Sequence, residues 1–284
     1  MPGPAGVWII TPGHAPDRFP AARSCAADVA LVDLEDSVPP ADKPDARQAA
    51  RAFFTDPAAA GPVPGVRISS PATLNGIHDL TALTAHSVKP PIVLIPKVES
   101  ARDIEIVAGI LDTPDYTPHL YALIETPRAV ENLPSIVRAD RIAGLLFGTA
   151  DYATTTGCSN SWEPLLHARS ALVTSAAVAG LPAIDSPYFD LDDDEGLRRE
   201  AEQVKALGFA GKSCVHPDQL PAVTAVFRPT REEIAAARAT VAAAENAGGR
   251  IVRVHGRMVG PPMVAAARAL LARASDNAPK EVSA

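Results

Sequence analysis

The stretch IVLIPKVESARDIEIVAGILD, residues 92–112, contains the unit from which the fold is predicted. Its first part, Ile92–Val98, is a short and nearly continuous apolar run, as expected of a strand that is buried on both faces. The second part, Glu99–Asp112, carries apolar residues at helical spacing, which form one stripe: Ile104, Val107, Ala108 and Leu111. A buried strand followed by an amphipathic helix is the repeating unit of parallel α/β folds.

The same strand-then-helix pattern continues in both directions along the chain. Most of the other strand-like runs are followed by a helix-like segment, such as Glu195–Leu207 with Gly208 at its C-terminal end. The seven further runs are Val7–Thr11, Val29–Leu34, Val66–Ser69, Leu120–Glu125, Ile142–Phe147, Ala183–Asp185 and Lys212–Val215. Eight such units predict a (β/α)₈ TIM barrel of the α/β class, and a doubly wound open sheet is the alternative.

Two more helical segments follow the eighth strand, at Arg231–Asn246 and Pro261–Ala274. A barrel needs only one of them, so the second is an extra C-terminal helical segment. We therefore expect a barrel core over residues 1–230. Residues 231–284 are expected to form C-terminal helices of the same domain, packed on the barrel or on a neighbouring subunit.

Composition narrows the classes of function. The 284 residues carry a net charge of −7, which leaves no basic field for nucleic acid or an anionic membrane. The three cysteines are too few and too scattered for a disulfide framework or a zinc site. No apolar run reaches the length of a bilayer, and no signal peptide is evident. The expected partner is a small-molecule substrate, and the expected location is the cytoplasm.

Acidic residues gather at the predicted carboxyl ends of the strands, where barrel enzymes have their active sites. Asp36 follows the second run, and Asp185 ends the seventh. Glu125 and Asp151 end neighbouring strands, so two carboxylates can converge there. Several anions in one mouth repel one another unless a cation joins them, and two carboxylates with open positions suit Mg²⁺. The alternative is that each acid is a solvated loop residue or a helix cap.

Basic residues also lie near this rim. Arg67 stands inside an apolar strand, where it either forms a salt bridge that ties the barrel together or clamps a substrate oxygen in bidentate fashion. Lys97 is expected to pair with Glu35 or Glu99, and a Schiff-base lysine is the alternative. Two residues that follow strand ends are candidates for a general base, with a structural role as the alternative: His14 and His216.

Motifs in all eight units, taken in order, resemble those of the HpcH/HpaI aldolase/citrate lyase family, in its branch of citrate lyase β-subunit-like proteins. The matching segments are TPG at 11–13 with DRF at 17–19, VDLEDSV at 32–38 with Lys43 and Arg47, VRI at 66–68, IPKVES at 95–100, LIET at 123–126, FGTADY at 147–152, AID at 183–185 and VHP at 215–217.

The resemblance implies a (β/α)₈ barrel that assembles as a homotrimer or hexamer and uses Mg²⁺. It implies reversible aldol- or Claisen-type cleavage of a β-hydroxyacyl compound, commonly a CoA thioester such as citryl-, malyl- or citramalyl-CoA. The implied site consists of Glu125 and Asp151 as metal ligands, Glu35 and Asp36 on metal-bound waters, Arg67 on an oxo or carboxylate oxygen, and the Gly13 loop with Arg18 along the substrate.

The chain departs from the family pattern at two places. The family has Asn-Arg or Asp-Arg directly after the Pro-Gly, whereas this chain has His14-Ala15. Gly260 stands where the family has an aspartate that reaches the site of a neighbouring subunit. The acid/base partner and the CoA end are therefore expected to differ. The alternatives to a CoA lyase are a Mg²⁺-dependent aldolase on a non-CoA 2-oxo acid and a weakly catalytic subunit of a larger complex.

Overall fold

Eight parallel strands form a closed barrel in the computed structural model, which describes residues 3, 5–55, 61–248, 250–254 and 256–276. Each strand pairs with the next, and β8 pairs with β1 to close the sheet, with Gly211 opposite Gly6. The strands are β1 Gly6–Pro12, β2 Val29–Asp33, β3 Val63–Arg67, β4 Ile92–Ile95, β5 His119–Ile124, β6 Ile142–Phe147, β7 Ala183–Asp185 and β8 Gly211–Cys214. The predicted barrel is confirmed, and the open-sheet alternative is wrong.

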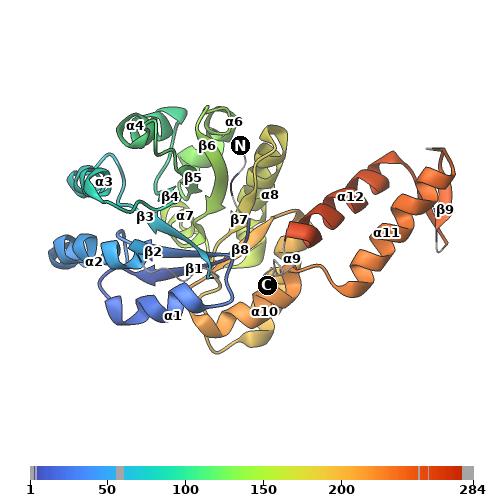
Figure 1. Ribbon diagram of the computed structural model, residues 1–284, viewed down its shortest axis with the longest axis horizontal. Coiled ribbons are helices and arrows are strands. Elements are labelled where there is room, and N and C mark those ends of the chain that lie inside the picture. Colours follow the sequence, from blue (N-terminus) through green and yellow to red (C-terminus); the bar gives the residue numbers. More distant parts are fainter. Residues whose placement is uncertain (1–2, 4, 56–60, 249, 255, 277–284) are drawn as a thin grey trace, which may run out of the picture. The chain divides into compact units, whose positions relative to one another are not determined.

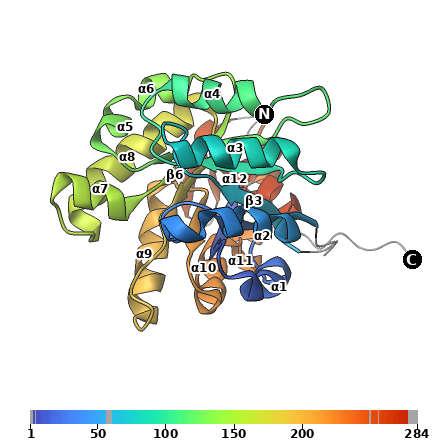
Figure 2. The same cartoon turned by 90° about the vertical axis from the view of Figure 1, so that its left-hand side faces the viewer.

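Helices surround this barrel on the outside (Figures 1 and 2). The α-helices are α1 Phe19–Ser24, α2 Lys43–Thr55, α3 Leu74–Ala85, α4 Ala101–Leu111, α5 Pro127–Glu131, α6 Leu133–Ile136, α7 Thr149–Thr156, α8 Trp162–Ala179, α9 Asp194–Leu207 and α10 Leu220–Phe227. Short 3₁₀ turns are η1 Pro16–Arg18, η2 Pro40–Asp42 and η3 Pro217–Gln219. In the described residues, no helix is both long and apolar enough to cross a bilayer.

The helix predicted from the opening stretch forms as expected. Ser100 and Asp103 make a reciprocal capping box at the start of α4, which satisfies backbone N–H groups that a helix otherwise leaves open. All four residues of the predicted apolar stripe are buried. The helix therefore begins at a cap and is held to the barrel by one face.

Two strands differ from their predicted bounds by up to three residues, whereas the other six agree within one residue at each end. The third strand was expected at Val66–Ser69 but spans Val63–Arg67. The prediction missed its first residues because Pro64 and Gly65 interrupt the apolar pattern there. The fourth was expected to reach Val98 but ends at Ile95. Pro96 follows, and Lys97 adopts a left-handed backbone conformation with φ of 53°, which turns the chain away from the sheet.

Apolar side chains form two clusters in the barrel unit. One fills the interior of the barrel, where the rings of Trp8 and Tyr121 meet edge to face with centroids 4.8 Å apart. The larger cluster lies between the strands and the surrounding helices. Gly144 is needed beside the interior cluster, because a Cβ there would lie 2.2 Å from the ring of Tyr121.

A buried ion-pair cluster joins β7 and β8 to the helices outside them. Lys212 and Asp185 are both 0% exposed, and the Lys212 amine lies 2.9 Å from Asp185 and 2.7 Å from Glu200 of α9. Arg169 of α8 also donates to Asp185, at 3.0 Å. Burial alone would raise the pKa of Asp185, but the charges of Lys212 and Arg169 hold that pKa below its usual value. Asp185 was expected at the mouth of the barrel, and this expectation is wrong.

The chain divides into two compact units, Met1–Phe227 and Arg228–Ala284. The second contains both predicted helices, α11 Arg231–Asn246 and α12 Pro261–Asp276. A two-stranded antiparallel hairpin that the sequence did not predict, β9 Val252–Val254 and β10 Arg257–Val259, lies between them in the chain. The expectation that this segment packs on the barrel or on a neighbouring subunit stays a prediction, and residues 277–284 lie outside the described part.

We expect Lys212→Met to destabilise the protein by about 3–5 kcal/mol, because it leaves Asp185 and Glu200 without their buried cation. The measurement is the free energy of unfolding from denaturant titration. Arg102→Met is the matched control, since Arg102 forms an exposed ion pair with Glu105 whose loss costs less than about 1 kcal/mol. Equal losses in the two variants would contradict the role given to the cluster.

Candidate active site

A cavity of about 310 Å³ opens at the carboxyl ends of the strands. This is the end at which barrel enzymes place their active sites. Four residues predicted from the sequence line it together: Arg18, Arg67, Glu125 and Asp151. Side chains from the ends of distant segments therefore meet in one hollow, as the barrel prediction required.

Arg67 is the central cation of the site. Its guanidinium donates two hydrogen bonds of 2.6 Å to the carboxylate of Asp33, and its other nitrogen lies 3.1 Å from Glu35. The side chain of Asp33 is completely buried, whereas that of Arg67 is 15% exposed and faces the cavity. Burial alone would raise the pKa of Asp33, but Arg67 brings it below its usual value. The salt-bridge alternative for Arg67 is thus observed, and the exposed part of the guanidinium stays available to a ligand.

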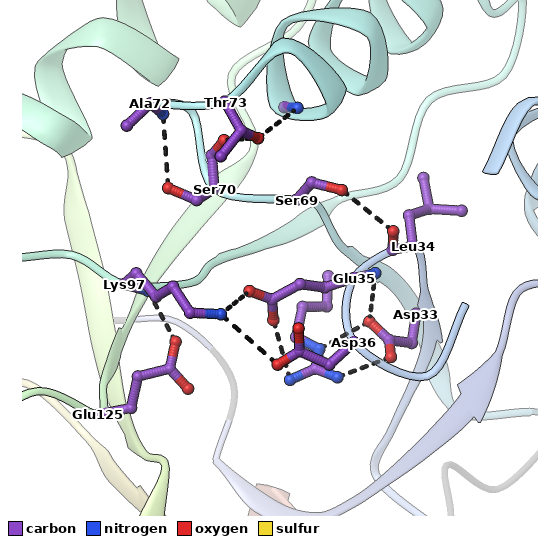
Figure 3. A network of polar contacts seen from close by, with 12 residues as sticks. Asp33, Leu34, Glu35, Asp36, Ser69, Ser70, Ala72, Thr73, Lys97 and Glu125 are labelled. Carbon is purple, nitrogen blue, oxygen red and sulfur yellow. Dashed lines mark hydrogen bonds and ion pairs between the residues drawn. The ribbon is translucent and has the colours of Figure 1, made fainter. Parts of the chain in front are cut away.

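Lys97 contacts acidic residues from two segments, Glu35 and Asp36 after β2 and Glu125 after β5 (Figure 3). Its amine lies 2.7 Å from Glu35 and 3.5 Å from Asp36, and its backbone N–H donates to Glu125 at 2.8 Å. Burial alone would lower the pKa of Lys97, but the hydrogen bond and charge of Glu35 raise it above its usual value. A protonated amine cannot form a Schiff base, so the geometry favours the predicted role of charge partner.

Burial disfavours the ionised forms of Glu35 and Glu125 in the protein without a bound cation. Burial raises the pKa of Glu35 to about 7, against the opposing charges of Arg67 and Lys97. Burial, followed by the charges of Glu35 and Asp151, raises the pKa of Glu125 well above its usual value. Repulsion of this kind is relieved by a bound cation, as the sequence argument expected.

The surroundings of Glu125 fit a small divalent cation. A Cβ at Gly148 would lie 2.5 Å from the Cβ of Glu125 and 2.7 Å from its Oε2, so only glycine leaves room for this carboxylate. Asp151 lies in the first turn of α7 and acts on Glu125 through its charge. Within the described residues no three His, Cys, Asp or Glu form a complete ligand group. Two carboxylates with the remaining positions open is the donor set that Mg²⁺ commonly uses.

Other predicted residues lie around the cavity rather than in its wall. The side chain of Asp36 is 56% exposed and contacts Lys97. Gly13 is buried, and its N–H donates to the backbone of Asp33 at 2.8 Å, so it anchors the loop after β1. His216 caps η3 with its ring nitrogen, which favours the structural role. His14 is exposed and does not line the cavity.

Sequence reasoning missed a buried hydroxyl pair beside the cavity. Ser186 accepts hydrogen bonds from the hydroxyl of Thr149 at 2.9 Å and from its N–H at 3.4 Å. Lys212 of the buried cluster donates to the backbone oxygen of Ser186 at 2.6 Å. Thr149 is the first residue of α7, the helix that carries Asp151. The hydroxyl pair therefore fixes the helix end that presents this acid, and a lone serine after a strand gave no signal of it.

We expect Ser186→Ala to loosen the first turn of α7, because Thr149 loses the acceptor of its N–H and hydroxyl. Leaving these buried donors unsatisfied costs about 1–3 kcal/mol. The measurement is hydrogen exchange of the backbone amides of residues 149–152, which should become several-fold faster. Ser213→Ala is the matched control, since Ser213 also loses one buried hydrogen bond, to the backbone of Asp185, but does not touch α7. Equal exchange in the two variants would show that Ser186 does not position this helix.

Comparison with known proteins agrees with this geometry. Residues 5–217 match the family described as HpcH/HpaI aldolase/citrate lyase. A citrate lyase subunit beta-like protein of Mycobacterium tuberculosis is 34% identical over 95% of both chains. A (3S)-malyl-CoA thioesterase of Cereibacter sphaeroides is 35% identical over 94% of this chain and 93% of its own. The structure of the protein CitE from Mycobacterium tuberculosis with magnesium, acetoacetate and coenzyme A superposes with a TM-score of 0.79, at 34% identity over 95% of this chain and 98% of the other.

Proposed function

The chain belongs to the HpcH/HpaI aldolase/citrate lyase family, and we propose that it is a Mg²⁺-dependent carbon–carbon lyase that cleaves a β-hydroxyacyl-CoA or a related hydroxy acid. The observation that carries the proposal is the meeting of Glu125, Asp151 and Arg67 in one cavity at the mouth of the barrel. The resemblance noted in the sequence to citrate lyase β-subunit-like proteins is confirmed by relatives that match nearly the whole chain.

Magnesium is supported by both chemistry and relatives. Glu125 and Asp151 would hold the ion through carboxylate oxygens, and the CitE structure was determined in complex with magnesium. Glu35 and Asp36 would accept hydrogen bonds from waters of the ion, as the resemblance implies. Bound Mg²⁺ supplies Lewis-acid polarisation of the oxygen of a 2-oxo acid.

The chain's own residues would bind and orient the substrate. Arg67 is held rigidly by Asp33 and Glu35, so its exposed face is a fixed donor for a carboxylate or oxo oxygen. Arg18 lines the same cavity and offers a second cation. The N-terminal end of α7, with Thr149 and Ala150 in the cavity wall, adds the partial positive charge of a helix start. These groups favour an anionic substrate despite the negative charge of the whole chain.

The test of this proposal is a panel of substrates in the presence of Mg²⁺. Citryl-, malyl- and citramalyl-CoA are compared with the corresponding free hydroxy acids, and the 2-oxo acid product is measured. Cleavage of the thioesters supports the CoA lyase, whereas cleavage of free acids alone supports the non-CoA aldolase. Cleavage of neither would support the third alternative, a weakly catalytic subunit. A homotrimer or hexamer remains the predicted assembly, which sedimentation would measure.

We predict that Mg²⁺ stabilises the protein and that Glu125→Gln and Gly148→Ala abolish most of this effect. Glutamine removes the ligand charge, and the added methyl group at position 148 displaces the carboxylate. An ion at a hundred times its dissociation constant stabilises the fold by about 2.7 kcal/mol, seen as a rise of several degrees in Tm. Glu99→Gln is the control, since Glu99 is a glutamate of the neighbouring loop that does not line the cavity. If Mg²⁺ stabilised Glu125→Gln as much as the native protein, Glu125 would not be a ligand of the metal ion.

Gly260 gives a prediction about the acid/base step, because the family places an aspartate there. We expect slow cleavage of malyl-CoA and no thioester hydrolysis by the native protein, and about 10²–10⁴-fold faster turnover in Gly260→Asp. The substitution fits the fold, since among the described residues a Cβ at this position meets Ile251 at 3.8 Å, an ordinary van der Waals distance. Product acetyl-CoA reports cleavage, and free CoA thiol reports hydrolysis. Rapid native turnover that does not rise in the variant would show that the missing acid is not needed.

A further inference from the structure

A buried lysine lies behind the mouth of the barrel and has no part in the reaction proposed above. Lys43 is the first residue of α2 and is only 9% exposed. Lysine is almost never buried to this extent unless its charge is paired. The acceptors of the Lys43 amine are instead two backbone oxygens and a hydroxyl. Ion pairing therefore does not explain why this charge is buried.

The amine of Lys43 holds the loop that follows β2, residues 34–39. It donates to the backbone oxygen of Leu34 at 2.6 Å and to that of Glu35 at 2.9 Å. These oxygens belong to the two peptide groups that flank Glu35, the second of which leads directly to Asp36. The amine also donates to the hydroxyl of Ser69 at 3.3 Å, so all three donors of the ammonium are used.

Ser69 supports the same loop from the end of β3. Its hydroxyl donates to the backbone oxygen of Leu34 at 3.1 Å (Figure 3). Its own N–H donates to Asp79 of α3 at 2.7 Å, and Asp79 pairs with Arg47 of α2. Arg47 lies four residues after Lys43, so both side chains leave the same face of the helix. Lys43 reaches the loop after β2, whereas Arg47 reaches α3.

Glu35 is consequently held at both its backbone and its side chain. Its carboxylate lies 2.7 Å from the amine of Lys97 and 3.1 Å from the guanidinium of Arg67. Its backbone oxygen is held by Lys43, which approaches from α2. Hydrogen bonds from an ionised donor are stronger than those from a neutral one. Two cations at the mouth therefore orient the carboxylate, while a third fixes the backbone from which it extends.

We propose that Lys43 is a positioning residue for the metal ion, because it fixes the backbone that carries Glu35 and Asp36. The inference rests on the proposed function, which assigns these two carboxylates to the waters of Mg²⁺. Lys43 does not line the cavity, so it acts only through the loop. Replacing a residue that orients groups around a metal ion typically costs about 10–100-fold in affinity for the ion.

The first test measures binding of Mg²⁺ alone, by calorimetry, to the native protein and to Lys43→Met. Methionine is similar in length to lysine but carries no charge and no donor. We expect its dissociation constant for Mg²⁺ to be at least about tenfold higher than that of the native protein. Arg47→Met is the matched control, since it removes a cation from the same helix face whose partners are Asp79 and Asn75 rather than the loop. Its affinity for Mg²⁺ should change less than about twofold.

The second test needs no metal ion. The backbone N–H groups of Glu35, Ser37 and Val38 are all hydrogen-bonded, so their hydrogen exchange reports on the order of the loop. Relative to the buried amides of β5, which report on global unfolding, these three should exchange at least about tenfold faster in Lys43→Met. In Arg47→Met the same ratio should stay within about twofold of the native value.

Ser69→Ala decides the matter if Lys43→Met does not fold. It keeps the buried charge but removes the hydroxyl that accepts from Lys43 and donates to Leu34. The affinity for Mg²⁺ should fall about threefold, as expected for the loss of a neutral hydrogen bond. Ser213→Ala is its control, since that hydroxyl bonds to the backbone of Asp185 and not to the loop. It should leave the affinity unchanged.

Binding of Mg²⁺ to the native protein separates failure of the inference from failure of the proposed function. If the native protein binds the ion and Lys43→Met binds it equally well, or exchanges its loop amides no faster, the inference is overturned and the lyase proposal stands. Equal losses of affinity in Lys43→Met and Arg47→Met overturn it too, because the loss then follows stability alone. If the native protein binds no Mg²⁺, the lyase proposal falls and the inference falls with it.

Discussion

The bidentate ion pair between Arg67 and Asp33 is the interaction on which the arrangement of the site depends. Asp33 ends β2 and is completely buried, so its charge is tolerable only beside a guanidinium. The same guanidinium reaches Glu35, Glu35 holds the amine of Lys97, and the backbone of Lys97 holds Glu125. One cation on β3 thus orders a chain of polar contacts that passes from β2 to β5 around half of the barrel mouth.

Many residues of this half of the barrel mouth could be predicted from the sequence. Charged residues such as Glu125 and Asp151 directly follow apolar strands, and closure of a parallel barrel brings all strand ends to one rim. The pairing of Arg67 was foreseen only as one alternative, because its partner Asp33 lies inside the apolar run itself. Asp185 was misplaced for a related reason. Successive strand residues face opposite sides, and the three residues of β7 are too few to show which side Asp185 faces.

The remaining features depend on tertiary contacts that leave no local pattern. The third strand was predicted too late in the chain, because Pro64 and Gly65 disrupt the apolar run without ending the strand. The hydroxyl pair of Ser186 and Thr149 joins residues that are 37 positions apart, and neither residue type signals a site. Ile10 and Val215 both line the cavity, although each, considered in isolation, is an ordinary apolar residue of a strand-like run. Only the order of strands around the barrel shows that they share one wall.

That order has a consequence for how the protein can change over evolutionary time. The groups assigned to the metal ion and the substrate oxygen, Arg67, Glu125 and Asp151, are encoded in residues 67–151, whereas another part of the cavity wall is encoded in residues 186–215. Mutation or recombination within the later stretch can therefore reshape what the cavity accepts while the catalytic groups stay untouched. Ile10, Pro12 and Arg18 belong to a third segment, which lies next to the later stretch because β1 closes the barrel beside β8. Related proteins with this arrangement can therefore acquire new substrates while they keep the groups that carry out the reaction.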